Sequence, residues 1–156
     1  MAEQSAGLIV YRRQNNRWEV FLVHPGGPYW KNKDEGVWSI PKGEFTAIED
    51  PLEAACREFY EETGFAISGT FEPLRVIKQR RGKVVYAWLV AGNFDASRLA
   101  SNLFSIEWPP RSGILQESPE IDRGEWLSLE DAKRKILGAQ RPLIEEAEML
   151  LHNRKG

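Results

Sequence analysis

The stretch from Gly43 to Phe65 constrains the fold of this chain more than any other part of the sequence. Asp50 and Pro51 are residue types preferred at the N-cap and the first position of a helix, and Gly64 is the type that commonly ends one. Apolar and acidic side chains recur between them at helical spacing. The sequence therefore predicts a helix between Pro51 and Gly64.

This helix has two different faces on a helical wheel. Apolar residues such as Phe59 occupy the arc that faces the core, and Cys56 lies among them as a small core residue. Three carboxylates share the adjacent arc. Like charges at this spacing destabilise a helix by about 0.2–0.5 kcal/mol per pair, so the acidic face indicates function. These carboxylates belong to Glu58, Glu61 and Glu62.

The acidic face suits a hard divalent cation, because Mg²⁺ binds carboxylate oxygens and shares the phosphate oxygens of a substrate. An ordinary solvated surface is the alternative. Residues 34–62 contain nine acidic residues against two basic ones, whereas basic side chains gather elsewhere, including the segment 75–83. We expect Arg80 of that segment to contact an anionic substrate.

The remainder of the chain is rich in β-strand patterns. Strands before and after the acidic helix, followed by two further helices, predict a mixed sheet with helices on both faces. The chain is expected to be one α/β domain over 1–156, with long loops at 24–36 and 111–122. The expected strands are 6–11, 18–23, 71–79, 83–91, 104–108 and 124–127, and the later helices are 129–137 and from about 142 onward.

The composition is typical of a globular protein, with 42% hydrophobic and 28% charged residues. A net charge of -2 argues against stable nucleic-acid binding. The single cysteine excludes an intramolecular disulfide. Residues 1–6 lack an apolar signal segment, and no apolar run has the length of a membrane span. We therefore expect a cytoplasmic protein without membrane contact, and the oligomeric state stays open.

The spacing from Gly43 to Phe65 matches the complete Nudix box, G-x5-E-x7-R-E-U-x-E-E-x-G-U, in which U is a bulky apolar residue. All nine fixed positions agree, so the chain resembles the Nudix hydrolases. The resemblance implies an α/β/α sandwich around a mixed β-sheet. It also implies hydrolysis of a nucleoside diphosphate linked to another group, with Mg²⁺ or Mn²⁺ as cofactor.

The resemblance also assigns roles by position. Glu49 pairs with Arg57 and orients the site. The general base varies within the family, and Glu58, Glu61 and Glu120 are the candidates here. Glu120 resembles an extra carboxylate that precedes a late tryptophan strand, with Glu117 as its rival. The implied metal ligands are Glu58, Glu61, Glu62 and the carbonyl of Lys42.

The segment 37–44 resembles the W-x-x-P-K-G entry of diadenosine- and diphosphoinositol-polyphosphate hydrolases, in which Lys42 would touch a phosphate. A tyrosine of some dinucleoside hydrolases is replaced here by Gly82, and a proline of ADP-ribose hydrolases by Arg80. Both departures weaken those assignments. The tryptophans that we expect to stack on a base are Trp30, Trp38 and Trp108.

Segments 107–113 and 119–123 look like a bacterial Nudix branch of NTP pyrophosphohydrolases. We therefore expect a Mg²⁺-dependent hydrolase that uses a metal-activated water to cleave a pyrophosphate bond in an NTP or a dinucleoside polyphosphate. The alternatives are a Nudix-fold sensor that binds nucleotides without turnover, and a hydrolase of inositol pyrophosphates or ADP-ribose. The expected partner is a small nucleotide-type molecule.

Overall fold

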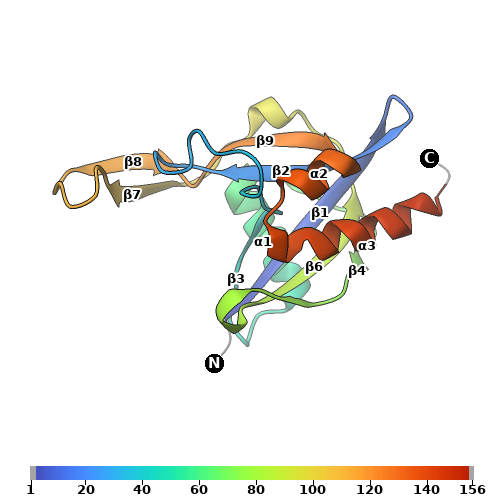
Figure 1. The fold of residues 1–156 in the computed structure, drawn as a ribbon. Helices are drawn as coiled ribbons and strands as arrows, with labels where there is room; N and C mark the ends of the chain where they lie inside the picture. The colour runs from blue at the N-terminus through green and yellow to red at the C-terminus, as the bar shows by residue number, and fades with distance from the viewer. Residues whose placement is uncertain (1–2, 155–156) are drawn as a thin grey trace.

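A computed structural model describes residues 3–154. Its centre is a seven-stranded sheet in the order β4-β6-β1-β2-β9, with β3 beside β1 and β5 beside β6, and β7 pairs with β8 in a separate hairpin (Figure 1). The strands are β1 (Gln4–Gln14), β2 (Arg17–Pro25), β3 (Lys42–Glu44), β4 (Glu72–Pro73), β5 (Ile77–Lys78), β6 (Val84–Ala91), β7 (Leu103–Glu107), β8 (Leu115–Pro119) and β9 (Ile121–Ser128). The α-helices are α1 (Pro51–Thr63), α2 (Leu129–Lys135) and α3 (Arg141–His152), and the short 3-10 turns are η1 (Arg80–Gly82), η2 (Ala96–Arg98) and η3 (Gly138–Gln140).

Strand β1 makes the sheet mixed. It runs parallel to β6 on one edge, and on the other edge it pairs antiparallel with β3 at its start and with β2 at its end. The β1–β2 hairpin turns through Asn15 and Asn16, which both have positive φ values, 52° and 62°. Asparagine tolerates this left-handed conformation better than most residues, which explains the turn.

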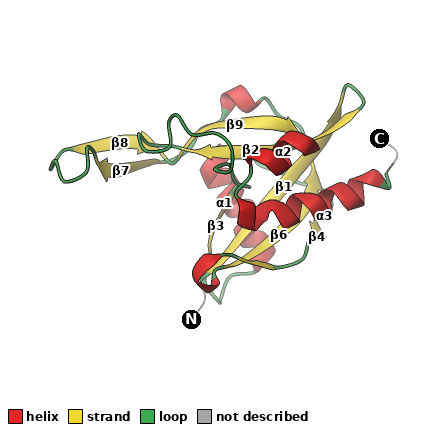
Figure 2. Ribbon diagram, viewed as in Figure 1, coloured by secondary structure: helices red, strands yellow, loops and turns green. Residues whose placement is uncertain are grey.

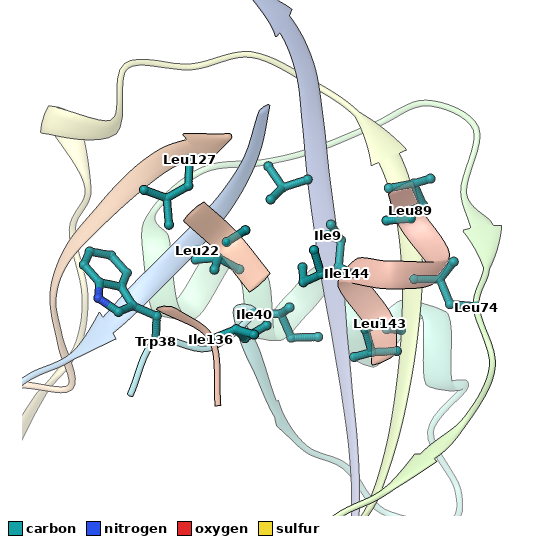
Figure 3. Packing of buried hydrophobic residues seen from close by; sticks show 14 of the residues in the cluster. Ile9, Leu22, Trp38, Ile40, Leu74, Leu89, Leu127, Ile136, Leu143 and Ile144 are labelled. Atoms are coloured by element: carbon teal, nitrogen blue, oxygen red, sulfur yellow. The ribbon is translucent and has the colours of Figure 1, made fainter. Parts of the chain in front are cut away.

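Alternation along β1 divides the core into two layers. Leu8 and Val10 point to one face of the sheet, where they pack with Phe59 of α1. Ile9 points to the other face and packs with Leu143 of α3 (Figure 3). Side chains of successive strand residues point to opposite faces, so one strand supplies both layers. Figure 2 shows α1 on one side of the sheet and α2 and α3 on the other, which confirms the predicted α/β arrangement.

Helix α1 has the predicted ends. The Asp50 carboxylate accepts a hydrogen bond from the backbone N–H of Glu53 at 3.0 Å, and Pro51 opens the helix. Gly64 has a left-handed φ of 81°, and its N–H donates to the carbonyl of Tyr60. Cys56 is partly buried against the α1 layer, as predicted for a small core residue.

The structure differs from the predicted strands and loops in three places. The predicted strand over 71–79 is two short pieces, β4 and β5, and between them the Arg75 N–H donates to the Glu146 carboxylate of α3 at 2.8 Å instead of to β6. The predicted loop over 111–122 contains β8 and the start of β9. Strand β8 is mostly exposed in a projecting hairpin, so it lacks the apolar alternation by which strands are recognised. The short strand β3 was not predicted.

Among residues 3–154, no helix combines the length and the apolar composition that crossing a bilayer requires. The cytoplasmic location stays a prediction. The expected single domain over 1–156 includes positions 1–2 and 155–156, which lie outside the described residues.

Candidate active site

The site begins where α1 packs against β3. A Cβ atom on Gly43 would lie 1.9 Å from Oε2 of Glu58 and 2.1 Å from its carboxyl carbon. A side chain at this position would have to displace the Glu58 carboxylate, so glycine leaves that carboxylate its room beside β3. Gly43 therefore sets the position of the Glu58 carboxylate.

Arg57 holds the loop before α1 on the helix. Its Nε and Nη2 atoms each donate to the Glu49 carboxylate at 3.1 Å, a two-pronged geometry that fixes both groups. This confirms the predicted pairing. The Nη1 atom also donates to Glu58 at 2.8 Å and to Glu61 at 3.2 Å. Arg57 therefore contacts two of the three box carboxylates, and the i,i+4 spacing could have indicated its contact with Glu61.

Glu62 is the most perturbed group of the site. Burial raises its pKa to about 8, the Lys42 backbone N–H and ammonium act in the opposite direction, and Glu58 and Glu120 raise it further. Its Oε2 atom accepts a hydrogen bond from the Lys42 backbone N–H at 3.1 Å. Burial also lowers the pKa of the Lys42 ammonium, which Glu62 partly opposes. Glu62 thus carries an incompletely compensated negative charge when ionised.

Glu58 is subject to similar electrostatic effects. Burial raises its pKa, Arg57 opposes the shift, and Glu61 and Glu120 add to it. The backbone of Glu120 is held by two hydrogen bonds of 2.8 Å, one from the Gly26 N–H and one to the Asn102 carbonyl. These bonds bring an acidic side chain from the β8–β9 junction to the acidic helix.

Glu117 does not share this position. It lies on β8 opposite Ser105 of β7, within the projecting hairpin. The geometry therefore favours Glu120 over Glu117 as the additional carboxylate of the site.

The carboxylates have the chemistry of a site for a hard divalent cation. Within residues 3–154, however, no three His, Cys, Asp or Glu side chains form a ready metal cage. The reason is visible in the contacts: Glu58 and Glu61 turn toward Arg57, and Glu62 turns toward the Lys42 N–H. The donor set fits a cation, and the excess of negative charge around Glu62 is what a cation would neutralise.

The three candidate tryptophans differ in their exposure. Trp38 is fully buried in the layer beneath α2 and α3, and its indole N–H donates to Asp34 at 2.8 Å. The structure contradicts a stacking role for Trp38, because core side chains cover the ring. Trp30 is half-buried and meets Tyr29 edge to face. Trp108 is half-buried just after β7.

The loop at 24–36 is anchored by a buried histidine. His24 is fully buried, and its two ring nitrogens lie 2.8 Å from the Asp122 carboxylate and 2.6 Å from the Lys33 carbonyl. His24 therefore ties the loop to the start of β9.

Gln140 is a structural support that the sequence did not indicate. It is fully buried, and its side-chain oxygen accepts from the Ile40 N–H at 3.0 Å. It therefore holds the segment that leads into β3. A lone glutamine between two helices gives no pattern from which this contact could have been predicted.

Arg80 lies apart from the box carboxylates. It is exposed in η1, at the turn between β5 and β6, where it lines a pocket together with Arg81 and Lys83. Among the predicted site residues, Arg80 is the one that the structure places in η1.

The mixed sheet lies between helices, and the acidic helix α1 packs against β3 at Gly43. These features define an α/β protein of the Nudix fold. The NUDIX domain family model matches residues 1–147, and the chain belongs to this family. An RNA pyrophosphohydrolase from Rhizobium meliloti (strain 1021) is 29% identical over 149 residues, which cover 90% of this chain and 87% of that protein.

Two further comparisons agree. The asymmetrical bis(5'-nucleosyl)-tetraphosphatase of Rattus norvegicus is 29% identical over 124 residues, covering 69% of this chain and 79% of that protein. A crystal structure of a C. elegans Ap4A hydrolase binary complex superposes with a TM-score of 0.65 at 25% identity, covering 98% of this chain and all of that one. The chain is accordingly a Nudix hydrolase that acts on pyrophosphate bonds.

Proposed function

We propose that this protein is a Mg²⁺-dependent hydrolase of nucleoside 5'-polyphosphates, acting through a single domain. The observation that carries the proposal is the group of carboxylates around Glu62, whose burial and acidic neighbours raise its pKa to about 8. Such a field is costly in a protein unless a cation or a proton is bound. The names of two relatives, an RNA pyrophosphohydrolase and a bis(5'-nucleosyl)-tetraphosphatase, support a nucleoside-containing phosphoric anhydride as the substrate.

Glu58, Glu61 and Glu62, with the carbonyl of Lys42, would hold the cation. When bound, Mg²⁺ supplies neutralisation of the pyrophosphate oxygens and a water of lowered pKa. Mn²⁺ has the same preference for oxygen ligands and would serve the same role.

The protein's own groups have distinct tasks. Glu58 and Glu120 are the favoured candidates for accepting the proton of the attacking water, because Glu58 already has a raised pKa and Glu120 lies in its field. Glu61 is a further candidate for the base. Arg57 positions Glu58 and Glu61 while Glu49 fixes its guanidinium. Lys42 places a cationic side chain beside the acids, where a substrate phosphate would lie.

The test is a substrate panel with Mg²⁺, in which products are separated by chromatography. It includes NTPs, dinucleoside polyphosphates and 5'-triphosphorylated RNA, with ADP-ribose and inositol pyrophosphates for the alternative classes. We expect turnover of a nucleoside 5'-polyphosphate, abolished in EDTA and in Glu61→Gln. Glu53→Gln is the matched control, because Glu53 is an exposed carboxylate in the first turn of the same helix, roughly two turns before Glu61.

Binding of these nucleotides without turnover would show that the protein is a nucleotide sensor and not an enzyme. Turnover that Glu61→Gln leaves intact would contradict the assigned site. A second readout is the melting temperature, which Mg²⁺ should raise relative to EDTA in the wild type and less in Glu61→Gln.

A further inference from the structure

His24, near the end of β2, is a buried titratable group to which the proposed reaction assigns no role. Its side chain is fully buried and meets the Trp38 ring edge to face, at a centroid distance of 5.1 Å. Both ring nitrogens have a close partner. Nδ1 lies 2.8 Å from Oδ1 of Asp122, and Nε2 lies 2.6 Å from the carbonyl oxygen of Lys33. These two partners determine the protonation state of the ring.

Both partners of the His24 ring are hydrogen-bond acceptors. A backbone carbonyl only accepts, and so does an ionised carboxylate, so each contact needs a proton on the histidine. A neutral imidazole carries a proton on one nitrogen and a lone pair on the other. In either tautomer, one lone pair would face the lone pairs of an oxygen at hydrogen-bonding distance. The geometry therefore requires an imidazolium with both nitrogens protonated.

Asp122 supplies the counter-charge of this imidazolium. Its side chain is 24% exposed to water, and Nη1 of Arg123 lies 3.8 Å from its Oδ1. Both conditions favour the ionised carboxylate, so the proton of the pair lies on the histidine. Burial disfavours an isolated imidazolium, and the Asp122 carboxylate and the Lys33 carbonyl oppose this effect by accepting from its two N–H groups.

The other charged groups near the ring have partners of their own. Asp34 accepts from the indole N–H of Trp38 at 2.8 Å and pairs with Nζ of Lys135, on α2, at 3.4 Å. The ammonium group of Lys33 lies over a tyrosine ring, 4.2 Å from its centroid. Within residues 3–154, Asp122 is therefore the charged side chain that contacts the imidazole directly.

The Asp122 residue stands at an irregularity in the pairing of β2 with β9. His24 pairs with Arg123, and Pro25 pairs with Ile121, so Asp122 is the extra residue of a β-bulge. A bulge leaves one residue outside the ladder and redirects side chains, often beside an active site. The side chain of His24 holds this bulged residue in place.

The second bond of the ring reaches the loop that follows β2. The Lys33 N–H donates to the Trp30 carbonyl at 2.9 Å, so the bond from His24 to the Lys33 carbonyl anchors the turn that carries Trp30. At the start of the same loop, the Gly26 N–H donates to the Glu120 carbonyl at 2.8 Å. One imidazole ring thus joins this loop to the segment that carries a candidate general base.

We propose that His24 is a positioning residue of the hydrolase: as an imidazolium it holds the loop after β2 against the segment of Glu120, and loss of its second proton releases the loop. This inference rests on the proposed function, because it concerns substrate affinity at the same site. When one proton leaves, the other stays with the stronger acceptor, the Asp122 carboxylate. The Lys33 carbonyl then faces a lone pair. The turn of Trp30, which we expect to stack on a base, loses its anchor.

Asp122→Asn tests this assignment without removing the hydrogen bond to the ring. An asparagine amide donates to Nδ1, so a neutral His24 then satisfies both contacts with its only proton on Nε2. The variant should therefore hold the loop without the second proton. Glu125→Gln is the matched control, because it removes an exposed carboxylate from the same strand.

Nitrogen-15 NMR of the imidazole rings reports the protonation state directly. The chain has two histidines, and the exposed His152 is the internal reference, assigned with His152→Gln. At about pH 6 we expect both ring nitrogens of His24 to be protonated in the wild type and in Glu125→Gln, and only one in Asp122→Asn. Burial alone would make the ring neutral. A ring nitrogen of His24 without a proton in the wild type would therefore overturn the inference, even if Asp122→Asn failed to fold.

Steady-state kinetics test the consequence for the reaction. We measure kcat and KM from about pH 6 to about pH 9, with the panel substrate that the wild type hydrolyses fastest. As the second proton of His24 leaves, KM should rise about three- to tenfold more in the wild type and in Glu125→Gln than in Asp122→Asn, which corresponds to one hydrogen bond. The profile of kcat should be the same in all three proteins, because the carboxylates of α1 titrate in each of them. An equal rise of KM in Asp122→Asn would contradict the role of His24.

Amide hydrogen exchange separates this inference from the proposed function. At about pH 8.5, residues 27–36 should exchange faster in the wild type than in Asp122→Asn, and at about pH 6 the two proteins should exchange alike. This difference in a protein without turnover would overturn the proposed function and keep His24 as the anchor of the loop. Equal exchange at both pH values in an active enzyme would overturn the role of His24 and keep the proposed function.

Discussion

Replacing Glu62 with glutamine should remove a large part of the pH dependence of stability in metal-free protein. The substitution keeps the shape of the side chain and its acceptor for the Lys42 N–H, at 3.1 Å in the wild type, but it removes the titrating proton. Only the ionisation of one buried carboxyl changes. The comparison therefore isolates the feature on which the proposed cation site depends.

The magnitude follows from the pKa. The Glu62 carboxyl titrates near its ordinary value of 4.5 in the unfolded chain and at about 8 in the folded protein. The folded state holds the proton more tightly, so this contribution to stability is complete below about pH 4.5 and is lost as the pH rises through about 8. Between about pH 6 and about pH 9 the free energy of unfolding should fall by roughly 3 kcal/mol from this group alone.

The assay is urea denaturation in EDTA at both pH values, followed by circular dichroism. We expect the wild type to lose roughly 3 kcal/mol more than Glu62→Gln across this interval. Glu53→Gln, on the exposed first turn of α1, should behave as the wild type does. Identical pH profiles for the wild type and Glu62→Gln would refute the argument that burial and acidic neighbours control this carboxyl.

Two further substitutions test the geometry of the site, and a third tests the hydrophobic core. Gly43→Ala places a Cβ atom 1.9 Å from the Glu58 carboxylate, so turnover measured by product chromatography should fall at least about tenfold; normal turnover would contradict the close approach. Arg57→Lys loses the two-pronged contact with Glu49, so kcat should fall while the free energy of unfolding changes by less than about 1 kcal/mol, because the pair is exposed. Leu143→Ala should cost about 2–5 kcal/mol in urea denaturation, since the side chain is fully buried.

Local sequence predicted the acidic helix well. The ends of α1 depend on contacts within a few residues, such as the bond between the Asp50 carboxylate and the Glu53 N–H and the left-handed Gly64. The helical wheel placed Phe59 on a different face from the carboxylates. This prediction needed no tertiary information, because the periodicity of side chains is the same in every α-helix. The pairing of Arg57 with Glu49 was available from the resemblance.

Contacts between distant segments could not be predicted in this way. Trp38 is an aromatic residue of the type that stacks on bases. Only its packing beneath α2 and α3 shows that core side chains cover its ring. The placement of Glu120 beside α1 depends on a hydrogen bond to Gly26, almost a hundred residues away in the chain. Strand β8 has little apolar alternation, because a projecting hairpin buries few side chains.

The sequence by itself determined the chemistry of the acidic stretch from Gly43 to Phe65 and the class of fold around it. Spacing and residue type specify a helix, its caps and the charge on one face, and these are local properties. The tertiary structure decided how that charge is used. Close packing against β3 buries Glu62 and perturbs its pKa. The register of β1 with β3 and β6 sets Lys42 and the strand after η1 on either side of β1, because strand pairing joins segments that the sequence separates.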